Sequence, residues 1–276
     1  MEFTMNYQLT KYEHQAMHAA ALFTDSSSMH KYAPSLFATE AHPRMTDKYA
    51  FTNTYDILLH IHNRGFNVTS IMGGDHRYKK VMVRMRSTHH DARDGSAPEV
   101  VIIDSHDGTS RLKMCMGIIR FACMNGMIAG DMFYSKSFTH RAPDLMEQVI
   151  LEIEDIDTHV TKLIQRITTM RNRSTDIGDR IALADAVVKS RWGEEKDASF
   201  VADMRQRLLT VRRIEDQEND IYTVMNVIQE NALRGGMSYV TSNNRIAAVR
   251  PISDVRRNLN INQTLWNTAE QLMEAA

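Results

Sequence analysis

Apolar residues follow two different periods along this chain, and that change most restricts its fold. In residues 66–71 and 80–88 (KVMVRMRST) they alternate with polar residues, which is the pattern of a half-buried strand, and in residues 100–103 and 114–121 they form short runs typical of buried strands. From residue 146 to residue 170 they recur at alternating spacings of 3 and 4, which is the heptad pattern of a helix. Strands followed by helices favour an α+β fold.

Turn-forming residues divide the amino-terminal half into strands. Gly73, Gly74 and Asp75 separate two alternating runs, and a polar turn that begins at Ser105 separates two apolar ones. A helix over residues 55–63, capped by Asn53 or Thr54, precedes them. These signals predict a four-stranded antiparallel sheet with flanking helices over residues 1–141. Asn125 and Gly126 are expected to form the turn that ends the last strand.

The carboxyl-terminal half, residues 142–276, is predicted to be helical. A long first helix carries the heptad seam, which either packs on the chain's own helices or joins copies into a homo-oligomer. Four more helices are expected at residues 177–189, 197–213, 220–233 and 262–275. The seam consists of Met146, Val149, Ile153, Ile156, Val160, Leu163, Ile167 and Met170.

Charge is distributed unevenly although the net charge is only −1. Residues 64–141 carry 12 Lys/Arg and 7 Asp/Glu, whereas residues 142–230 carry 12 and 18. We therefore predict a phosphate-contacting face on the sheet and a basic arm at residues 238–258, with an ordinary solvated surface as the alternative. The predicted nucleic-acid contacts are Lys79, Lys80, Arg84, Arg86, Arg111, Lys113, Arg120, Arg245 and Arg250.

The consecutive residues Ser105, His106 and Asp107 contain the residue types of a catalytic triad. Neighbouring side chains project in different directions, so these three are not expected to converge on one substrate. We predict instead a turn in which Ser105 and Asp107 accept local backbone N–H groups while His106 projects outward. The motif residues of this hairpin are Ser105, His106, Asp107, Gly108, Asn125 and Gly126.

No common cofactor-binding or metal-binding signature is present, so no cofactor is predicted. His14 and His18 have helical i,i+4 spacing but lack the glutamate of a zinc-protease helix. Asp104, Asp107 and Asp131 leave open a carboxylate cluster that binds Mg²⁺.

Cysteine usage and hydropathy bear on the compartment. Cys115 and Cys123 lie in apolar runs, as reduced core cysteines of a cytoplasmic protein do. No apolar run approaches the ~18 residues of a membrane span, so no membrane contact is predicted.

Residues 105–109 (SHDGT) and 117–127 (GIIRFACMNGM) resemble the signature of a phage- and plasmid-encoded protein family of unknown function. That family typically has an N-S-H-D-G-[ST] turn and a G-x-x-R-x-x-C-x-N-G-x run, and Asp104 stands where it usually has Asn. Residues 229–236 (QENALRGG) and 265–266 (LW) resemble it too. The resemblance extends from about residue 50 to the end; it implies a mobile-element protein and carries over no catalytic residue.

Three functions remain open at this stage. The first is non-enzymatic binding or annealing of single-stranded DNA on the basic sheet face, with Phe66, Tyr78 and Phe121 as candidates for base stacking. The second is an anti-defence or host-interaction protein that binds another protein through the polar loop 89–98 and the acidic helical half. The third is a metal-dependent nuclease. Each is expected to act in the host cytoplasm.

Overall fold

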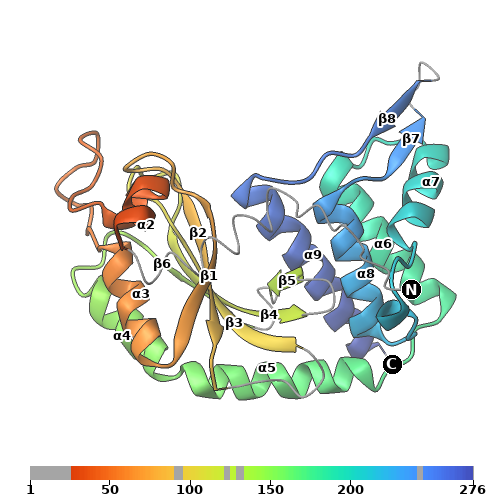
Figure 1. Cartoon of the computed structure of the whole chain (residues 1–276), viewed down its shortest axis with the longest axis horizontal. Coiled ribbons are helices and arrows are strands. Elements are labelled where there is room, and N and C mark those ends of the chain that lie inside the picture. Colours follow the sequence, from red (N-terminus) through yellow and green to blue (C-terminus); the bar gives the residue numbers. More distant parts are fainter. Residues whose placement is uncertain (1–25, 90–95, 121–124, 129–133, 241–244, 276) are drawn as a thin grey trace, which may run out of the picture. The chain divides into compact units, whose positions relative to one another are not determined.

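The computed structural model describes residues 26–89, 96–120, 125–128, 134–240 and 245–275 (Figure 1). His14 and His18 lie outside these ranges. The chain forms two compact units. The first unit comprises residues 1–88, 102–112 and 138–153, and the second comprises residues 89–101, 113–137 and 154–276.

Six strands form one antiparallel sheet in the order β1-β2-β3-β4-β5, with β6 paired to β4. The α+β prediction is therefore confirmed, with two strands more than expected. The extra strands have only four residues each, too few to show a clear period. The strands are β1 Phe66–Gly73, β2 Val81–Ser87, β3 Ser96–Asp104, β4 Leu112–Arg120, β5 Asn125–Ile128 and β6 Ser135–Phe138.

The predicted Asn-Gly turn is wrong. Asn125 and Gly126 begin strand β5, where they pair with Arg120 and Ile119 of β4. The connection between these strands falls at residues 121–124, outside the described part of the chain.

Strand β3 is buried at every one of its nine positions. Successive side chains of a strand point to opposite faces, so both faces of β3 are covered. This agrees with its place between β2 and β4 and with its continuous apolar run at residues 100–103. The buried set includes the carboxylate of Asp104, the last residue of the strand.

Helix α3 (Thr54–Asn63) lies beside the β1–β2 hairpin in the first unit (Figure 1). Asn53 caps it, as predicted, because its side chain accepts the backbone N–H groups of Tyr55 and Asp56. This unit also contains α2 (Ser26–Tyr32), η1 (Pro34–Phe37) and most of α4 (Leu145–Glu154).

The heptad segment forms two helices rather than one. Helix α4 ends at Glu154, and α5 (Ile156–Arg171) begins after a break at Asp155. Seven of the eight seam residues are at most 3% exposed, and Met146 is half-buried. The seam residues are therefore covered by side chains of the same chain, as the prediction of intramolecular packing expects.

The second unit contains the other predicted helices. Aspartates at positions 176, 197, 220 and 254 cap four of them by accepting backbone N–H groups of the first turn. The last helix begins at Val255 rather than at residue 262, and part of the predicted basic arm forms the two-stranded β7–β8 sheet. The elements are α6 Ile177–Trp192, α7 Ala198–Leu208, η2 Ile214–Asp216, α8 Ile221–Arg234, β7 Ser238–Val240, β8 Ile246–Ala248 and α9 Val255–Glu274. Within the described residues, no helix is both long and apolar enough to cross a bilayer.

Candidate functional site

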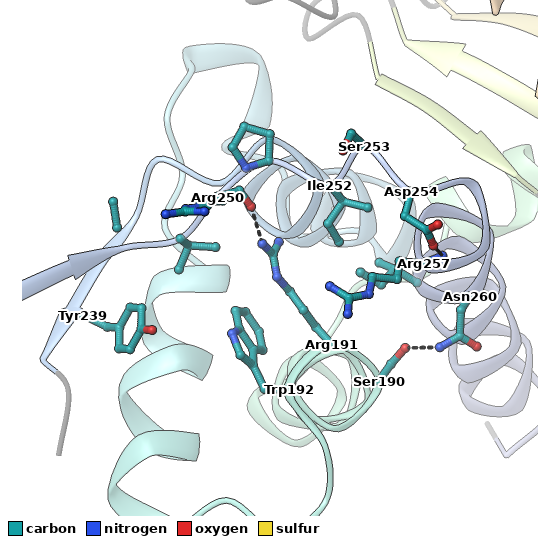
Figure 2. Close-up of a pocket in the computed structure, with 14 residues that line it drawn as sticks. Ser190, Arg191, Trp192, Tyr239, Arg250, Ile252, Ser253, Asp254, Arg257 and Asn260 are labelled. Carbon is teal, nitrogen blue, oxygen red and sulfur yellow. Dashed lines mark hydrogen bonds between the residues drawn. The ribbon is translucent and has the colours of Figure 1, made fainter. Parts of the chain in front are cut away.

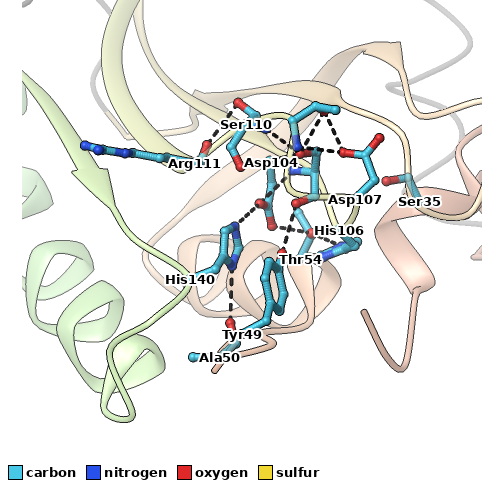
Figure 3. A network of polar contacts seen from close by, with 12 residues as sticks. Ser35, Tyr49, Ala50, Thr54, Asp104, His106, Asp107, Ser110, Arg111 and His140 are labelled. Carbon is cyan, nitrogen blue, oxygen red and sulfur yellow. Dashed lines mark hydrogen bonds and ion pairs between the residues drawn. The ribbon is translucent and has the colours of Figure 1, made fainter. Parts of the chain in front are cut away.

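The signature turn, residues 104–110, connects β3 to β4 and is held by its own side chains (Figure 3). The Ser105 hydroxyl accepts the backbone N–H of Ser110 at 2.9 Å, and Asp107 Oδ1 accepts that of Thr109 at 3.0 Å. Gly108 has a φ of 74°, a conformation that favours glycine. The prediction that Ser105 and Asp107 shape a turn is confirmed.

His106 does not project outward as predicted, because its side chain is fully buried. Its backbone is fixed on both sides: its N–H donates to the Tyr78 carbonyl at 3.0 Å, and its carbonyl accepts the His42 N–H at 2.8 Å. With both backbone groups bonded to neighbouring segments, the imidazole points into the first unit, where Phe51 lies 5.1 Å from it between ring centroids.

The Asp104 carboxylate is the centre of a buried polar network (Figure 3). Its Oδ2 accepts the Thr54 hydroxyl at 2.9 Å, and its Oδ1 lies 3.1 Å from His140 Nε2. His106 Nε2 lies 3.0 Å from the same Thr54 oxygen. Because Thr54 uses its proton toward Asp104, its oxygen is the acceptor for an N–H of His106. The network thus runs from His106 through Thr54 to Asp104.

His140 joins the network from the other side of the carboxylate. Its Nε2 faces the Asp104 carboxylate, and its Nδ1 lies 3.3 Å from the Ala50 carbonyl. Both ring nitrogens therefore face oxygen atoms of the first unit. Tyr49 stacks on this ring at 4.6 Å and donates its hydroxyl to the Ser105 carbonyl. Burial, and then the Asp104 charge, raise the pKa of Tyr49, so its hydroxyl remains a donor.

Burial separates this network from solvent. Asp104, Thr54 and His106 are fully buried, and the hydrogen bonds named above join them within the fold. Among the described residues, no group of three His, Cys, Asp or Glu side chains is placed to hold a metal ion. Asp131, the third member of the predicted carboxylate cluster, lies outside those residues.

His106 is expected to make stability depend on pH. Burial lowers its pKa below the usual 6.5, an effect that outweighs the opposite effect of Asp104. The unfolded chain therefore binds more protons than the folded one at acidic pH, and stability is lost as the pH falls below about 6.5. His106→Gln keeps a donor for Thr54 but does not titrate. We expect it to lose less unfolding free energy than the wild type between about pH 7 and pH 5, measured by urea unfolding. If the wild type and the variant lose the same unfolding free energy, His106 is not the source of the pH dependence.

The signature turn also positions exposed cations of the first unit. The Asp107 carbonyl accepts the Arg44 guanidinium, with Nε at 3.0 Å. The loop before β2 is bound through Tyr78 to His106 and through the Lys79 carbonyl to the Ser35 hydroxyl at 2.6 Å. The side chains of Arg44, Arg77 and Lys79 are about half exposed, at 54%, 49% and 56%. Sequence reasoning missed Arg44 and Arg77, which lie in loops without a periodic pattern.

Strand β2 presents two of the predicted contacts on one face. Arg84 lies opposite Ser70 of β1, and Arg86 lies opposite Asn67. Both arginines are half-buried, while Val81, Val83 and Met85 are buried, as the alternation predicted. The first unit also carries Lys79, Lys80 and Arg111, and the second carries Lys113, Arg245 and Arg250.

Two predicted contacts are wrong because the side chains are buried. Arg120 is 6% exposed and forms an ion pair with Asp216, so it has no access to DNA. Phe66 is fully buried and is not a stacking surface. Tyr78 is half-buried with a cation, Arg77, 5.5 Å from its ring centroid, and Phe121 lies outside the described residues.

The chain was compared with curated proteins, solved structures and protein families. It is 26% identical over 254 residues to each of two Escherichia coli K12 proteins, UPF0380 protein YafZ and UPF0380 protein YfjQ. Each alignment covers 88% of this chain and 89% of the relative. No solved structure matches the chain. The model of a domain of unknown function, DUF932, matches residues 41–266. Since this match spans most of the sequence, the chain belongs to the DUF932 family.

Proposed function

We propose that this protein binds or anneals single-stranded DNA, without catalysing a reaction, in the cytoplasm of a cell that carries a mobile element. The observation that carries the proposal is the group of exposed and half-buried cations around the signature turn and β2. We call this group the basic surface of the first unit. It comprises Arg44, Arg77, Lys79, Lys80, Arg84, Arg86 and Arg111.

Two cations of the basic surface, Arg77 and Lys79, form only exposed ion pairs within the protein. Arg77 forms an ion pair with Glu40 at 3.3 Å, and Lys79 lies 3.8 Å from Asp75, with all four side chains about half exposed or more. Exposed pairs contribute only about 0–1 kcal/mol each, so a phosphate can replace the carboxylate at little cost. The half-buried ring of Tyr78 lies among these cations and offers a stacking surface for a base.

The test is fluorescence anisotropy with a short single-stranded oligonucleotide over a range of salt concentrations. We expect Arg84→Gln/Arg86→Gln to weaken binding about 10-fold or more at low salt. It should also reduce the slope of log K against log salt by about 1.4, because each lost phosphate contact on a single strand accounts for about 0.7. The matched control is Lys162→Gln/Lys189→Gln, which removes the same charge from exposed positions on α5 and α6.

Different outcomes favour different functions. Wild-type protein that fails to bind even at low salt contradicts the proposal, as does an arginine variant that binds like the control variant. Co-purification of a protein partner, with no DNA binding, favours the host-interaction hypothesis. Cleavage of the oligonucleotide that requires Mg²⁺ favours the nuclease hypothesis.

A further inference from the structure

A cavity of about 650 Å³ lies within the second unit (Figure 2). The end of α6 contributes Ser190, Arg191 and Trp192 to its lining, the β7–β8 sheet contributes Tyr239, and the start of α9 contributes Arg257 and Asn260. This volume lies in the range of about 300–1,000 Å³ that is typical of small-molecule sites.

Two arginines extend into the same space from different helices (Figure 2). Arg191 Nη2 donates to the Arg250 carbonyl at 2.6 Å, while its Nη1 is buried with no hydrogen-bond partner. Within the described part of the chain, neither Arg191 nor Arg257 forms an ion pair with a carboxylate. A buried guanidinium donor without an acceptor is costly, and a ligand with acceptor oxygens removes that cost.

The cavity also concentrates positive charge. Burial, and then the charge of Arg257, lower the pKa of Arg191 to about 10, which shows that the two guanidinium groups repel each other. The carboxylate among the described lining residues is Asp254, and its Oδ1 accepts the backbone N–H of Arg257 as the cap of α9. The site therefore favours an anion over a cation.

Neutral groups complete the set of donors. The Ser190 hydroxyl oxygen accepts the Asn260 amide at 2.8 Å and the Thr264 hydroxyl at 3.4 Å, so its own proton is left to donate. Arg191 lies 4.8 Å from the ring centroid of Trp192. Trp192 and Tyr239 are half-buried and line the cavity, where their rings offer a surface for a planar group.

We propose that this cavity binds a phosphate group attached to a nucleoside, with Arg191 and Arg257 contacting the phosphate and Trp192 or Tyr239 contacting the base. A guanidinium group can donate two parallel N–H bonds to two oxygens of one phosphate. Two arginines and a hydroxyl donor therefore suit a phosphate group. A lone phosphate would leave most of the cavity volume unfilled, whereas a nucleotide occupies much more of it. The ligand is either a free nucleotide or the terminal nucleotide of a DNA strand. The site does not depend on DNA binding by the first unit.

Calorimetric titration of the full chain tests the proposal with deoxyadenosine monophosphate, deoxyadenosine and inorganic phosphate as ligands. We expect the monophosphate to bind, the nucleoside without phosphate to bind at least about 10-fold more weakly, and inorganic phosphate to compete with the monophosphate. Arg257→Gln should weaken monophosphate binding about 10-fold or more, because a charge-assisted contact is lost. Arg257 is exposed, so its replacement should leave the fold intact.

The matched control is Arg256→Gln, the neighbouring exposed arginine of α9, which is not among the residues that line the cavity. It should bind within about twofold of the wild type. A 5′-phosphorylated oligonucleotide and its 5′-hydroxyl form are each tested as competitors of the monophosphate. If only the phosphorylated form competes, the ligand is a strand end. If neither form competes, the ligand is a free nucleotide. No binding of the monophosphate, or equal binding by the Arg257 and Arg256 variants, would overturn the proposal.

Discussion

Asp104→Ala is expected to lower the free energy of unfolding by about 3–5 kcal/mol, because a buried group that loses its hydrogen-bond partner typically costs about 1–3 kcal/mol. The substitution removes the acceptor of the Thr54 hydroxyl and of the Ser105 N–H, and it removes the partner of His140 Nε2. Each of these groups has at most 7% exposure, so water does not replace the lost carboxylate. Urea unfolding followed by circular dichroism measures the change.

Two further variants show whether the charge or the hydrogen bonds of Asp104 matter most. Asp104→Asn keeps one acceptor oxygen but removes the charge, and we expect it to cost about 1–3 kcal/mol. Asp107→Ala removes a carboxylate from the same turn, and it loses the local bonds to Thr109 and a long, exposed ion pair with Arg44, so about 1 kcal/mol is expected. An Asp104→Ala variant no less stable than Asp107→Ala would show that the buried network does not hold the first unit together.

Arg120→Ala should have a comparable effect in the second unit, about 3–5 kcal/mol, because it leaves the Asp216 carboxylate buried at 3% exposure. The Glu215 carbonyl also loses its guanidinium donor. Arg213 lies 3.8 Å from Asp216 and compensates part of the charge, so the lower end of this range is expected. Thermal and urea unfolding measure the loss.

The control for Arg120 is Lys113→Ala, a half-exposed position on the same strand, for which a change within about 0.5 kcal/mol is expected. Arg120→Ala should also bind single-stranded DNA like the wild type at temperatures where both proteins are folded. An Arg120→Ala protein that is as stable as the wild type but binds DNA more weakly would show that Arg120 contacts DNA. That result would contradict its structural role.

Arg84, Arg86 and Arg120 show the limit of strand periodicity. All three occur in predicted strands, and the sequence analysis placed all of them among the nucleic-acid contacts. Arg120 differs because Asp216, which is 96 positions away in the chain, comes beside it in the folded second unit. His106 was likewise predicted from its turn alone, but its orientation depends on partners at positions 54 and 78.

Local patterns were sufficient to predict the α+β class, the cap at Asn53, the turn at Gly108 and the alternation of β2, because each depends on residues within one turn or strand. Burial of His106, the ion pair of Arg120 and the cavity at Arg191 required the folded chain. Each depends on segments distant in sequence, whose meeting is set by packing of the whole unit rather than by periodicity.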